Sequence, residues 1–225
     1  MNLRPYLQII LIALFASAAL SSLTIRSGHA DVPVADNADS IEPLQVGDRA
    51  PRFKLRDVDG ALVEFDPQSL QRPIVLLAYR GGWCPFCNSY LSDMRHVIPE
   101  IRKLGVDVWF LSGDRPDQLF ASLSMETQSD IAGLDYTLLS DADAQASMAL
   151  GIAFRASSAT IKGRHEKGQD IEGSSMQKHA VLPVPAVFAI DTDGVIRFAF
   201  TNANYKHRLP ADKLLAAAEL IAAAD

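Results

Sequence analysis

The only two cysteines of this 225-residue chain, Cys84 and Cys87, lie at a predicted turn from a strand into a helix. The apolar run 74–79 precedes them and predicts a strand that is buried on both faces. After them, apolar residues recur at helical spacing from Leu91 to Ile101. The N-terminus of a helix favours a thiolate, and a second sulfur one turn later can close a disulfide. The pair therefore predicts a redox site and requires a fold in which a strand end meets a helix start.

The residues around the pair suggest a different role for each sulfur. Cys84 precedes Pro85, which favours the first helical position, so Cys84 is expected at the helix N-cap. Cys87 lies one turn into the helix, where we expect it to be more buried and to act as the resolving cysteine. Arg80 is close enough in sequence to add a positive charge that lowers the pKa of Cys84. Trp83 is expected to shield one side of the pair.

Two other roles for the cysteines, a zinc site and a structural disulfide, have less support in the sequence. A zinc site needs further ligands, but the chain has no second cysteine pair, and His165 and His179 lie fourteen residues apart in a predicted loop. A purely structural disulfide would close a very short loop and would remove little entropy from the unfolded chain. We therefore expect neither a metal nor a cofactor.

Pro185 is the second informative residue, because it directly precedes the predicted strand 187–190. Proline cannot donate a hydrogen bond to a sheet, so it belongs at the first position of a strand. A cis bond at Pro185 would press this loop against the dithiol and leave a backbone edge for a substrate. A trans bond would only begin the strand, and the residues alone leave both alternatives open.

The other segments predict alternating strands and helices. Alternating runs beside the Asp-x-Asp-Gly turns at 57–60 and 191–194 predict two hairpins. The remaining predictions are strands at 106–111 and 136–139 and helices at 115–127, 142–151 and 210–225. Asp114 is the expected N-cap of the helix at 115–127. This order predicts an α/β fold, with a central mixed β-sheet flanked by helices and an N-terminal β-hairpin extension.

The first thirty residues have the pattern of an export signal. Arg4 gives a positive start, residues 6–25 are almost wholly apolar or small, and Gly28-His29-Ala30 offers a cleavage site. If it is not cleaved, the stretch 6–25 is long enough to anchor the protein in a membrane. In both cases we expect the rest of the chain to be exported, into the periplasm if the organism is bacterial.

The mature chain is expected to be one acidic domain. Segment 1–30 carries two arginines and no acid, so its removal changes the net charge from −6 to −8. This charge argues against nucleic acid as a partner. Residues 31–43 are expected to be a linker and residues 44–225 the domain, with a loop insertion at 155–181 that is rich in Gly, Ser, Lys and Gln. The basic turn 204–208 is expected only to be solvated, with closure of the active site as its alternative role.

Several motifs together resemble a known family. Residues 46–55, followed by Asp57 and Gly60, resemble the opening signature of the alkyl hydroperoxide reductase and thiol-specific antioxidant group, which are peroxiredoxin-like proteins of the thioredoxin-fold superfamily. Residues 83–87, Trp-Cys-Pro-Phe-Cys, are similar to a thioredoxin-type redox box, and Val184-Pro185 resembles the cis-proline loop. The resemblance extends over about residues 44–222. It implies a thioredoxin-like fold, redox activity and a cis bond at Pro185.

The chain also departs from the peroxiredoxin pattern Pro-x-x-x-Thr-x-x-Cys. Counted from Tyr79, the family proline falls on Arg80, the threonine on Cys84 and the peroxidatic cysteine on Cys87. The arginine that peroxiredoxins place near a strand falls on Pro185. If the chain is compared with thioredoxin instead, Cys84 is the nucleophile and Cys87 the resolving cysteine.

Three functions are compatible with these patterns. The first is an antioxidant, peroxiredoxin-like peroxidase that reduces hydroperoxides through a dithiol/disulfide cycle and is restored by a thiol donor such as a thioredoxin-type reductant. The second is a thioredoxin-like thiol–disulfide oxidoreductase that acts on exported proteins. The third is a non-enzymatic thioredoxin-fold binding module.

Overall fold

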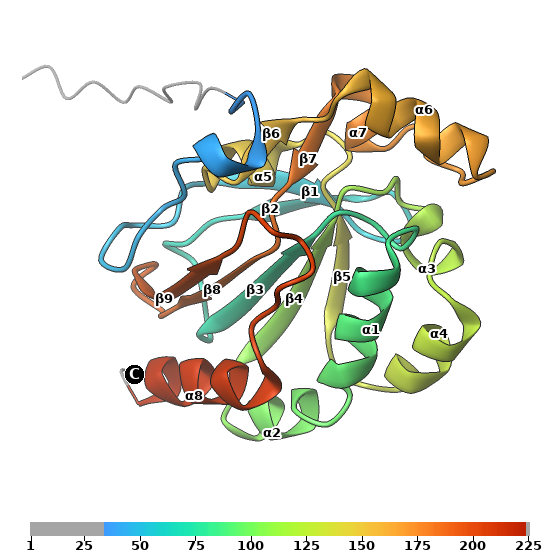
Figure 1. Ribbon diagram of the computed structural model, residues 1–225. Helices are drawn as coiled ribbons and strands as arrows, with labels where there is room; N and C mark the ends of the chain where they lie inside the picture. The colour runs from blue at the N-terminus through green and yellow to red at the C-terminus, as the bar shows by residue number, and fades with distance from the viewer. Residues whose placement is uncertain (1–33, 224–225) are drawn as a thin grey trace, which may run out of the picture. The chain divides into compact units, whose positions relative to one another are not determined.

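The computed structural model describes residues 34–223, so the predicted export signal at 1–30 lies outside the described residues. Within the described part, a seven-stranded sheet has the strand order β2-β1-β5-β4-β3-β8-β9 (Figure 1). Its strands are β1 (Phe53–Arg56), β2 (Leu62–Phe65), β3 (Ile74–Tyr79), β4 (Asp107–Ser112), β5 (Thr137–Ser140), β8 (Ala186–Ile190) and β9 (Ile196–Thr201). Strands β3, β4 and β5 are parallel, and the other pairs are antiparallel. The predicted mixed sheet is confirmed.

Helices surround this sheet, and a small second sheet lies beside it. The helices are α1 (Pro85–Met94), α2 (Ile98–Lys103), α3 (Gln118–Ala121), α4 (Met125–Ile131), α5 (Gln145–Ala149), α6 (Ser158–Glu166), α7 (Ser175–His179) and α8 (Ala211–Ala222), with a 3-10 turn at Ala38–Ser40. Strands β6 (Ala153–Arg155) and β7 (Val181–Pro183) pair with each other. None of the helices in residues 34–223 combines the length and the apolar character that crossing a membrane requires.

The central strand β3 is buried on both faces because its alternate residues enter different hydrophobic clusters. Val75 and Leu77 pack in the cluster that includes the buried residues of α1, α2 and α8. Leu76 and Ala78 face the opposite cluster, to which β1, β2 and α5 contribute. Burial on both faces explains why the run 74–79 is continuously apolar. It also makes the end of β3 a rigid support for residues 80–84, the redox turn that leads into α1.

The predicted helix at 115–127 is wrong, because the chain forms two shorter helices there. Ser122 to Ser124 separate α3 from α4, and the Ser124 side chain caps α4 by accepting a hydrogen bond from the Thr127 amide. Asp114 is not a cap. It is buried, and its carboxylate accepts hydrogen bonds from the Gly82 amide and the Ser122 hydroxyl.

The predicted loop at 155–181 is also wrong, since it contains α6 and α7. The side chains of Ser157 and Ser174 cap the two helices. Helix α6 has no buried residue, so its sequence carries no apolar period from which a helix could be predicted.

Residues 34–43 do not form the expected linker. The Ala35 amide donates to the carbonyl of Ala153, and Ala35, Ala38 and Ile41 pack against the main hydrophobic cluster. These short apolar side chains are spaced three apart among acidic residues, which conceal them in the sequence. The domain therefore begins before residue 44, and residues 31–33 lie outside the described part.

Candidate active site

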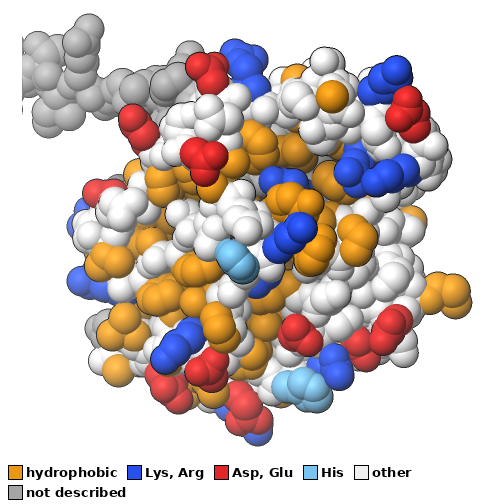
Figure 2. Space-filling model, in the orientation of Figure 1, with side chains coloured by type: hydrophobic (Ala, Val, Ile, Leu, Met, Phe, Trp, Pro, Cys, Tyr) orange, Lys and Arg blue, Asp and Glu red, His pale blue; other side chains and the backbone are white. Residues whose placement is uncertain are grey.

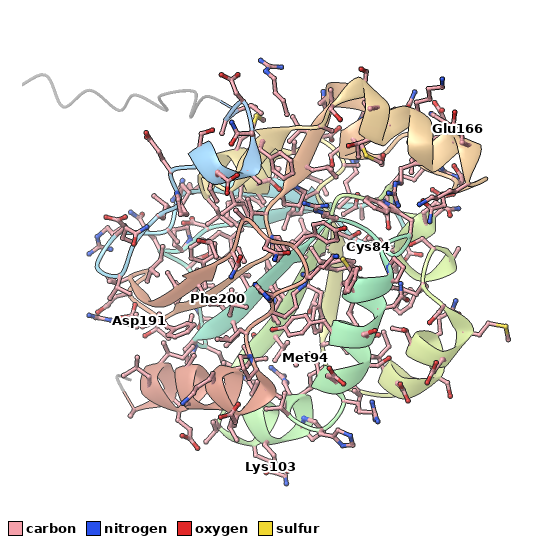
Figure 3. The ribbon with its side chains drawn as sticks, in the orientation of Figure 1. Cys84, Met94, Lys103, Glu166, Asp191 and Phe200 are labelled. Carbon is pink, nitrogen blue, oxygen red and sulfur yellow. The ribbon has the colours of Figure 1, made fainter. Side chains whose placement is uncertain are left out.

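The redox turn connects the end of β3 to the start of α1, as predicted (Figure 3). Cys84 is the N-cap residue with extended backbone angles, φ −93° and ψ 115°, and Pro85 follows at the first helical position. Cys84 is 2% exposed and Cys87 is fully buried, and both are free thiols in this structure. Cys87 is the more buried of the two, as predicted, although both side chains are buried.

The surroundings of the two sulfurs shift their pKa values in opposite directions. The hydrogen bond from the Cys87 thiol lowers the pKa of Cys84 to about 6, although burial works in the other direction. The Cys87 amide and the charges of Arg208 and Arg80 make smaller contributions to this lowering. Burial raises the pKa of Cys87 well above its usual value, and the negative charge on Cys84 adds to this effect. At neutral pH the pair therefore holds one thiolate, on Cys84, and one proton, on Cys87.

Arg80 lies beside the dithiol, as the sequence suggested, but aromatic rings hold its side chain. Its guanidinium carbon is 4.1 Å from the ring centroid of Tyr205 and 5.5 Å from that of Phe154. Tyr205 also contacts Phe86 edge-on, at 5.6 Å between ring centroids. The loop at 202–210, between β9 and α8, thus covers the redox turn.

The sequence predicts a solvated turn at 204–208, with closure of the active site as the alternative, and it predicts no role for Arg208 in particular. Its Nη2 atom donates a hydrogen bond to the Cys87 sulfur at 3.2 Å. Its guanidinium carbon lies 5.6 Å from the ring centroid of Tyr90. The two partners are 121 residues apart, so no local spacing could reveal the contact. Figure 2 shows basic side chains beside hydrophobic ones near the middle of this face.

Trp83 packs in the same cluster as both cysteines and is itself covered by the segment 158–169. The guanidinium carbon of Arg164 lies 4.9 Å from the Trp83 ring, and Gln169 Nε2 donates to the Trp83 carbonyl at 3.0 Å. Helix α6, which the sequence did not predict, and the residues after it therefore pack against the outer side of the redox box.

The expected cis bond at Pro185 is wrong, because no cis peptide bond occurs among residues 34–223. The chain runs from β7 into β8 with only Val184 and Pro185 between them. The Val184 amide donates a hydrogen bond to the Ile152 carbonyl, and the Pro185 carbonyl accepts one from the Asn202 amide. The backbone therefore stays extended between β7 and β8 and makes no sharp turn at Pro185. Pro185 still lies near the pair, in a small cavity that Tyr90 and Arg208 also line.

Buried polar contacts fix the loop before Cys84. The Gly82 amide donates to the Asp114 carboxylate at 2.7 Å, and Asn88 Nδ2 donates to the carbonyls of Gly82 and Cys84. The amide of Ser124 in turn donates to Asn88 Oδ1 at 2.8 Å. Burial raises the pKa of Asp114 to about 6 against these hydrogen bonds. The sequence gives no sign of the role of Asn88, and it predicts a different role for Asp114, that of a helix N-cap.

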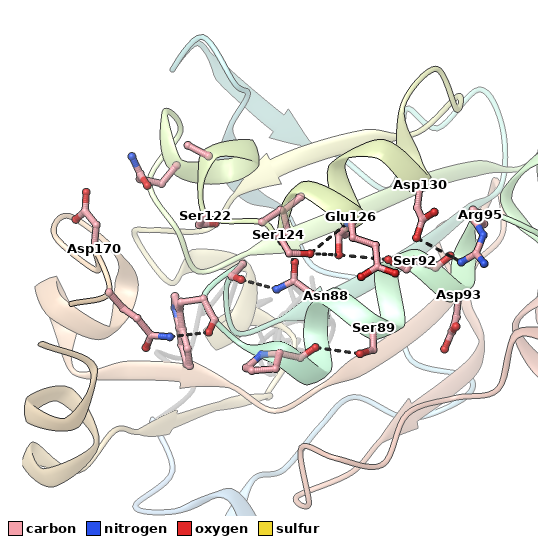
Figure 4. Close-up of a pocket in the computed structure, with 18 residues that line it drawn as sticks. Asn88, Ser89, Ser92, Asp93, Arg95, Ser122, Ser124, Glu126, Asp130 and Asp170 are labelled. Atoms are coloured by element: carbon pink, nitrogen blue, oxygen red, sulfur yellow. Dashed lines mark hydrogen bonds and ion pairs between the residues drawn. The ribbon is translucent and has the colours of Figure 1, made fainter. Parts of the chain in front are cut away.

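A polar cleft of about 820 Å³ opens beside the redox turn, between α1, the α3–α4 region and Gln169 (Figure 4). Gly82, Trp83 and Pro85 form its border towards the cysteines, but neither cysteine lines it. Its walls carry hydroxyl and carboxylate groups, among them those of Ser124 and Glu126. In residues 34–223, no cluster of three or more His, Cys, Asp or Glu side chains has a metal-binding arrangement.

Comparison with known proteins agrees with this fold. The model of the AhpC/TSA family matches residues 46–199. Peroxiredoxin Bcp of Escherichia coli K12 is 35% identical over 112 residues, which cover 50% of this chain and 67% of the relative. The thiol-disulfide oxidoreductase ResA of Bacillus anthracis is 25% identical over 155 residues, or 69% of each chain.

A solved structure gives the same result for the fold. Reduced Prx3 of Vibrio vulnificus, in complex with hydrogen peroxide, superposes with a TM-score of 0.59 at 18% identity. The match covers 78% of this chain and 96% of that protein. The chain therefore belongs to the AhpC/TSA family and is a peroxiredoxin-like oxidoreductase with a thioredoxin-type fold.

Proposed function

We propose that this protein is a hydroperoxide-reducing peroxidase in which Cys84 attacks the peroxide and Cys87 closes the disulfide. The observation that carries the proposal is the asymmetry of the pair. The pKa of Cys84 is lowered to about 6, whereas burial and the neighbouring thiolate keep Cys87 protonated. Only a thiolate is an effective nucleophile towards a peroxide oxygen, so Cys84 is the sulfur prepared to react.

The cycle needs no cofactor. The Cys84 thiolate attacks one oxygen of the hydroperoxide, the O–O bond breaks, and the other oxygen leaves as water or an alcohol after it takes up a proton. Cys84 is then a sulfenic acid. The Cys87 sulfur attacks the Cys84 sulfur, the S–O bond breaks, and water leaves as the disulfide forms.

A thiol donor must then reduce the disulfide. We propose a thioredoxin-type dithiol protein for this role, on the basis of membership in the family. Its thiolate would attack Cys84, because Cys84 lies at the helix start and Cys87 is fully buried. Arg80, Trp83, Pro85 and Pro185 are proposed to support the site by shaping the surroundings of this sulfur.

Cysteine variants test the assignment of the two roles. Reduced Cys87→Ser should still consume one equivalent of hydrogen peroxide and accumulate a sulfenic acid on Cys84, detected by mass spectrometry after dimedone labelling. Cys84→Ser should lose the fast reaction. A sulfenic acid on Cys87 and a slow Cys87→Ser variant would reverse the assignment, and no reaction of the wild type at micromolar peroxide would reject the peroxidase.

Thiol–disulfide exchange with exported proteins is a second candidate, favoured by the Cys-x-x-Cys pair at the helix start and by the relationship to ResA. Cys87→Ser would then trap mixed disulfides through Cys84 in the exported fraction. The rates of oxidation by peroxide and by a protein disulfide, measured on the same reduced protein, distinguish the two activities. A slow peroxide step beside fast exchange would favour the second candidate.

We also propose that the protein is exported, with residues 1–30 as a cleaved signal. The positive Arg4, the apolar stretch 6–25 and the site before Asp31 support this proposal. N-terminal sequencing of the mature protein should begin at Asp31. A protein of full length that stays in the membrane fraction at alkaline pH would indicate an anchor, and a protein in the cytoplasm would contradict export.

A further inference from the structure

The Cys87 sulfur has a cationic partner that neither the redox motif nor the family pattern assigns. Arg208 Nη2 donates to this sulfur at 3.2 Å, from a loop that follows the last strand of the sheet. Among residues 34–223, no carboxylate lies within ion-pair distance of Arg208 or of Arg80 (the ion pairs of this part involve other cations). A partly buried cation without a carboxylate partner favours a thiolate beside it.

The two arginines near the pair are held differently. Arg80 is placed against the rings of Tyr205 and Phe154, at 4.1 and 5.5 Å. Arg208 instead points its Nη2 atom at the Cys87 sulfur. The buried Nε atoms of both arginines have no hydrogen-bond partner among the described residues. The guanidinium of Arg208 is therefore the one whose direct polar partner is Cys87.

Resolution is the step in which Cys87 needs such a partner. Burial raises its pKa, so the sulfur is protonated while Cys84 is reduced. When Cys84 has become a sulfenic acid, Cys87 must lose its proton to attack. An N–H donor and a positive charge at 3.2 Å stabilise the thiolate more than the thiol, and so they act in this second step.

We propose that Arg208 is the positioning residue for resolution, and that it directs the Cys87 sulfur and stabilises its thiolate as it attacks the Cys84 sulfenic acid. In this step the S–S bond forms, the S–O bond of Cys84 breaks, and hydroxide leaves with the proton given up by Cys87 as water. The oxidant is the hydroperoxide already consumed by Cys84. The proposal rests on the peroxidase cycle described above and adds the group that controls its second half.

Arg208→Met tests the proposal by separating the two halves of the cycle. In stopped-flow measurements with hydrogen peroxide, disulfide closure should slow by about 10- to 100-fold, the loss expected for a hydrogen bond to a charged group. The rate of sulfenic acid formation should fall much less. The pH at which closure reaches half its maximal rate should rise, and other groups facing Cys87, namely Cys84, Arg80 and Tyr79, are unchanged in this variant.

A matched control is available in the same loop. Lys206 is also a cation, but its Nζ atom lies 5.6 Å from the Phe86 ring centroid rather than on sulfur, so Lys206→Met should leave both rates unchanged. Arg208→Lys keeps the charge and should recover part of the closure rate. If circular dichroism shows that Arg208→Met is unstable, the closure rate of Arg208→Lys tests the proposal in its place.

A second readout follows from the lifetime of the sulfenic acid. Slow closure gives a second peroxide time to oxidise Cys84 to a sulfinic acid, so Arg208→Met should become inactivated at lower peroxide concentration. If closure and inactivation equal those of the wild type, the role of Arg208 is wrong while the peroxidase stands. If the wild type forms no sulfenic acid, the proposed function itself fails.

Discussion

At the scale of single residues, the site depends on unequal burial of two identical side chains. Cys84 and Cys87 lie one turn apart, yet one is the N-cap and the other is inside the helix with no exposed surface. The proton that Cys87 retains is the one that stabilises the Cys84 thiolate. The nucleophile is therefore activated mainly by its own resolving partner, and the helix N-terminus and the arginines add to that effect.

This dependence predicts how Cys84 titrates. In the reduced wild type, thiolate absorbance at 240 nm should rise with a midpoint at about pH 6. Cys87→Ala removes the donor and should raise the midpoint by at least about one unit, whereas Cys87→Ser keeps a hydroxyl donor and should raise it less. Equal midpoints in all three proteins would show that the thiol hydrogen bond does not activate Cys84.

The lowered pKa of Cys84 also predicts how the stability of the folded protein changes with pH. The pKa of Cys84 is below its unfolded value of about 8.5, so ionisation stabilises the folded state. Relative to Cys84→Ser, the reduced wild type should gain stability in urea unfolding as the pH rises from about 6 to 8.5. This gain should be absent at pH values below the folded pKa.

At the scale of elements, the redox turn is held closely by its neighbours. A Cβ atom on Gly82 would lie 2.1 Å from Ser122 Oγ and 2.7 Å from the Ser122 carbonyl carbon, so the backbone between α3 and α4 leaves no room for a side chain. This approach allows the Gly82 amide to reach Asp114. The gap between α3 and α4 thus has a structural role in the site.

Substitution of Gly82 tests this packing. Gly82→Ala should lower the free energy of unfolding by about 1–3 kcal/mol through overpacking, and it should also slow the reaction with peroxide. Gly163→Ala is the control, because a Cβ there meets nothing within 4 Å and alanine favours a helix by about 0.5–1 kcal/mol. Unchanged stability and rate in Gly82→Ala would contradict the close approach.

Elements with a strong local pattern could be predicted, and those held by distant contacts could not. Strand β3, both hairpins and α8 follow from apolar runs, Asp-x-Asp-Gly turns and an Ala- and Leu-rich stretch. Helix α6 has no buried face, and the interruption between α3 and α4 depends on Asn88 and Asp114. The redox box was predictable because its chemistry is local, whereas Arg208 reaches Cys87 only through the completed sheet.

At the scale of the whole molecule, the domain is larger at its N-terminal end than composition suggested. The described residues 34–223 belong to one compact unit, in which Ala35 pairs with the strand residue Phe154. Gly151 has φ +71°, and a Cβ there would lie 2.1 Å from the Glu42 carbonyl oxygen. The segment before residue 44 is therefore fitted to the domain surface and contributes to its stability.

Truncation tests this boundary. A chain that begins at Leu44 loses the packing of Ile41 and its neighbours and should unfold with a free energy at least about 2 kcal/mol lower than a chain that begins at Asp31. Urea unfolding of the two purified chains gives the comparison. Equal stabilities would show that residues 31–43 only connect the domain to the preceding segment.

The position of Arg208 near the end of the chain also bears on when the site becomes reactive. An unfolded chain has neither the helix start nor this guanidinium beside the sulfurs, so its cysteines have an ordinary pKa of about 8.5 and are mainly protonated at neutral pH. Cys87 is made 121 residues before its partner Arg208, and Cys84 is made earlier still. The dithiol is thus a weak nucleophile throughout synthesis, and its full reactivity arises only when folding brings the loop at 202–210 against the two cysteines and Phe86.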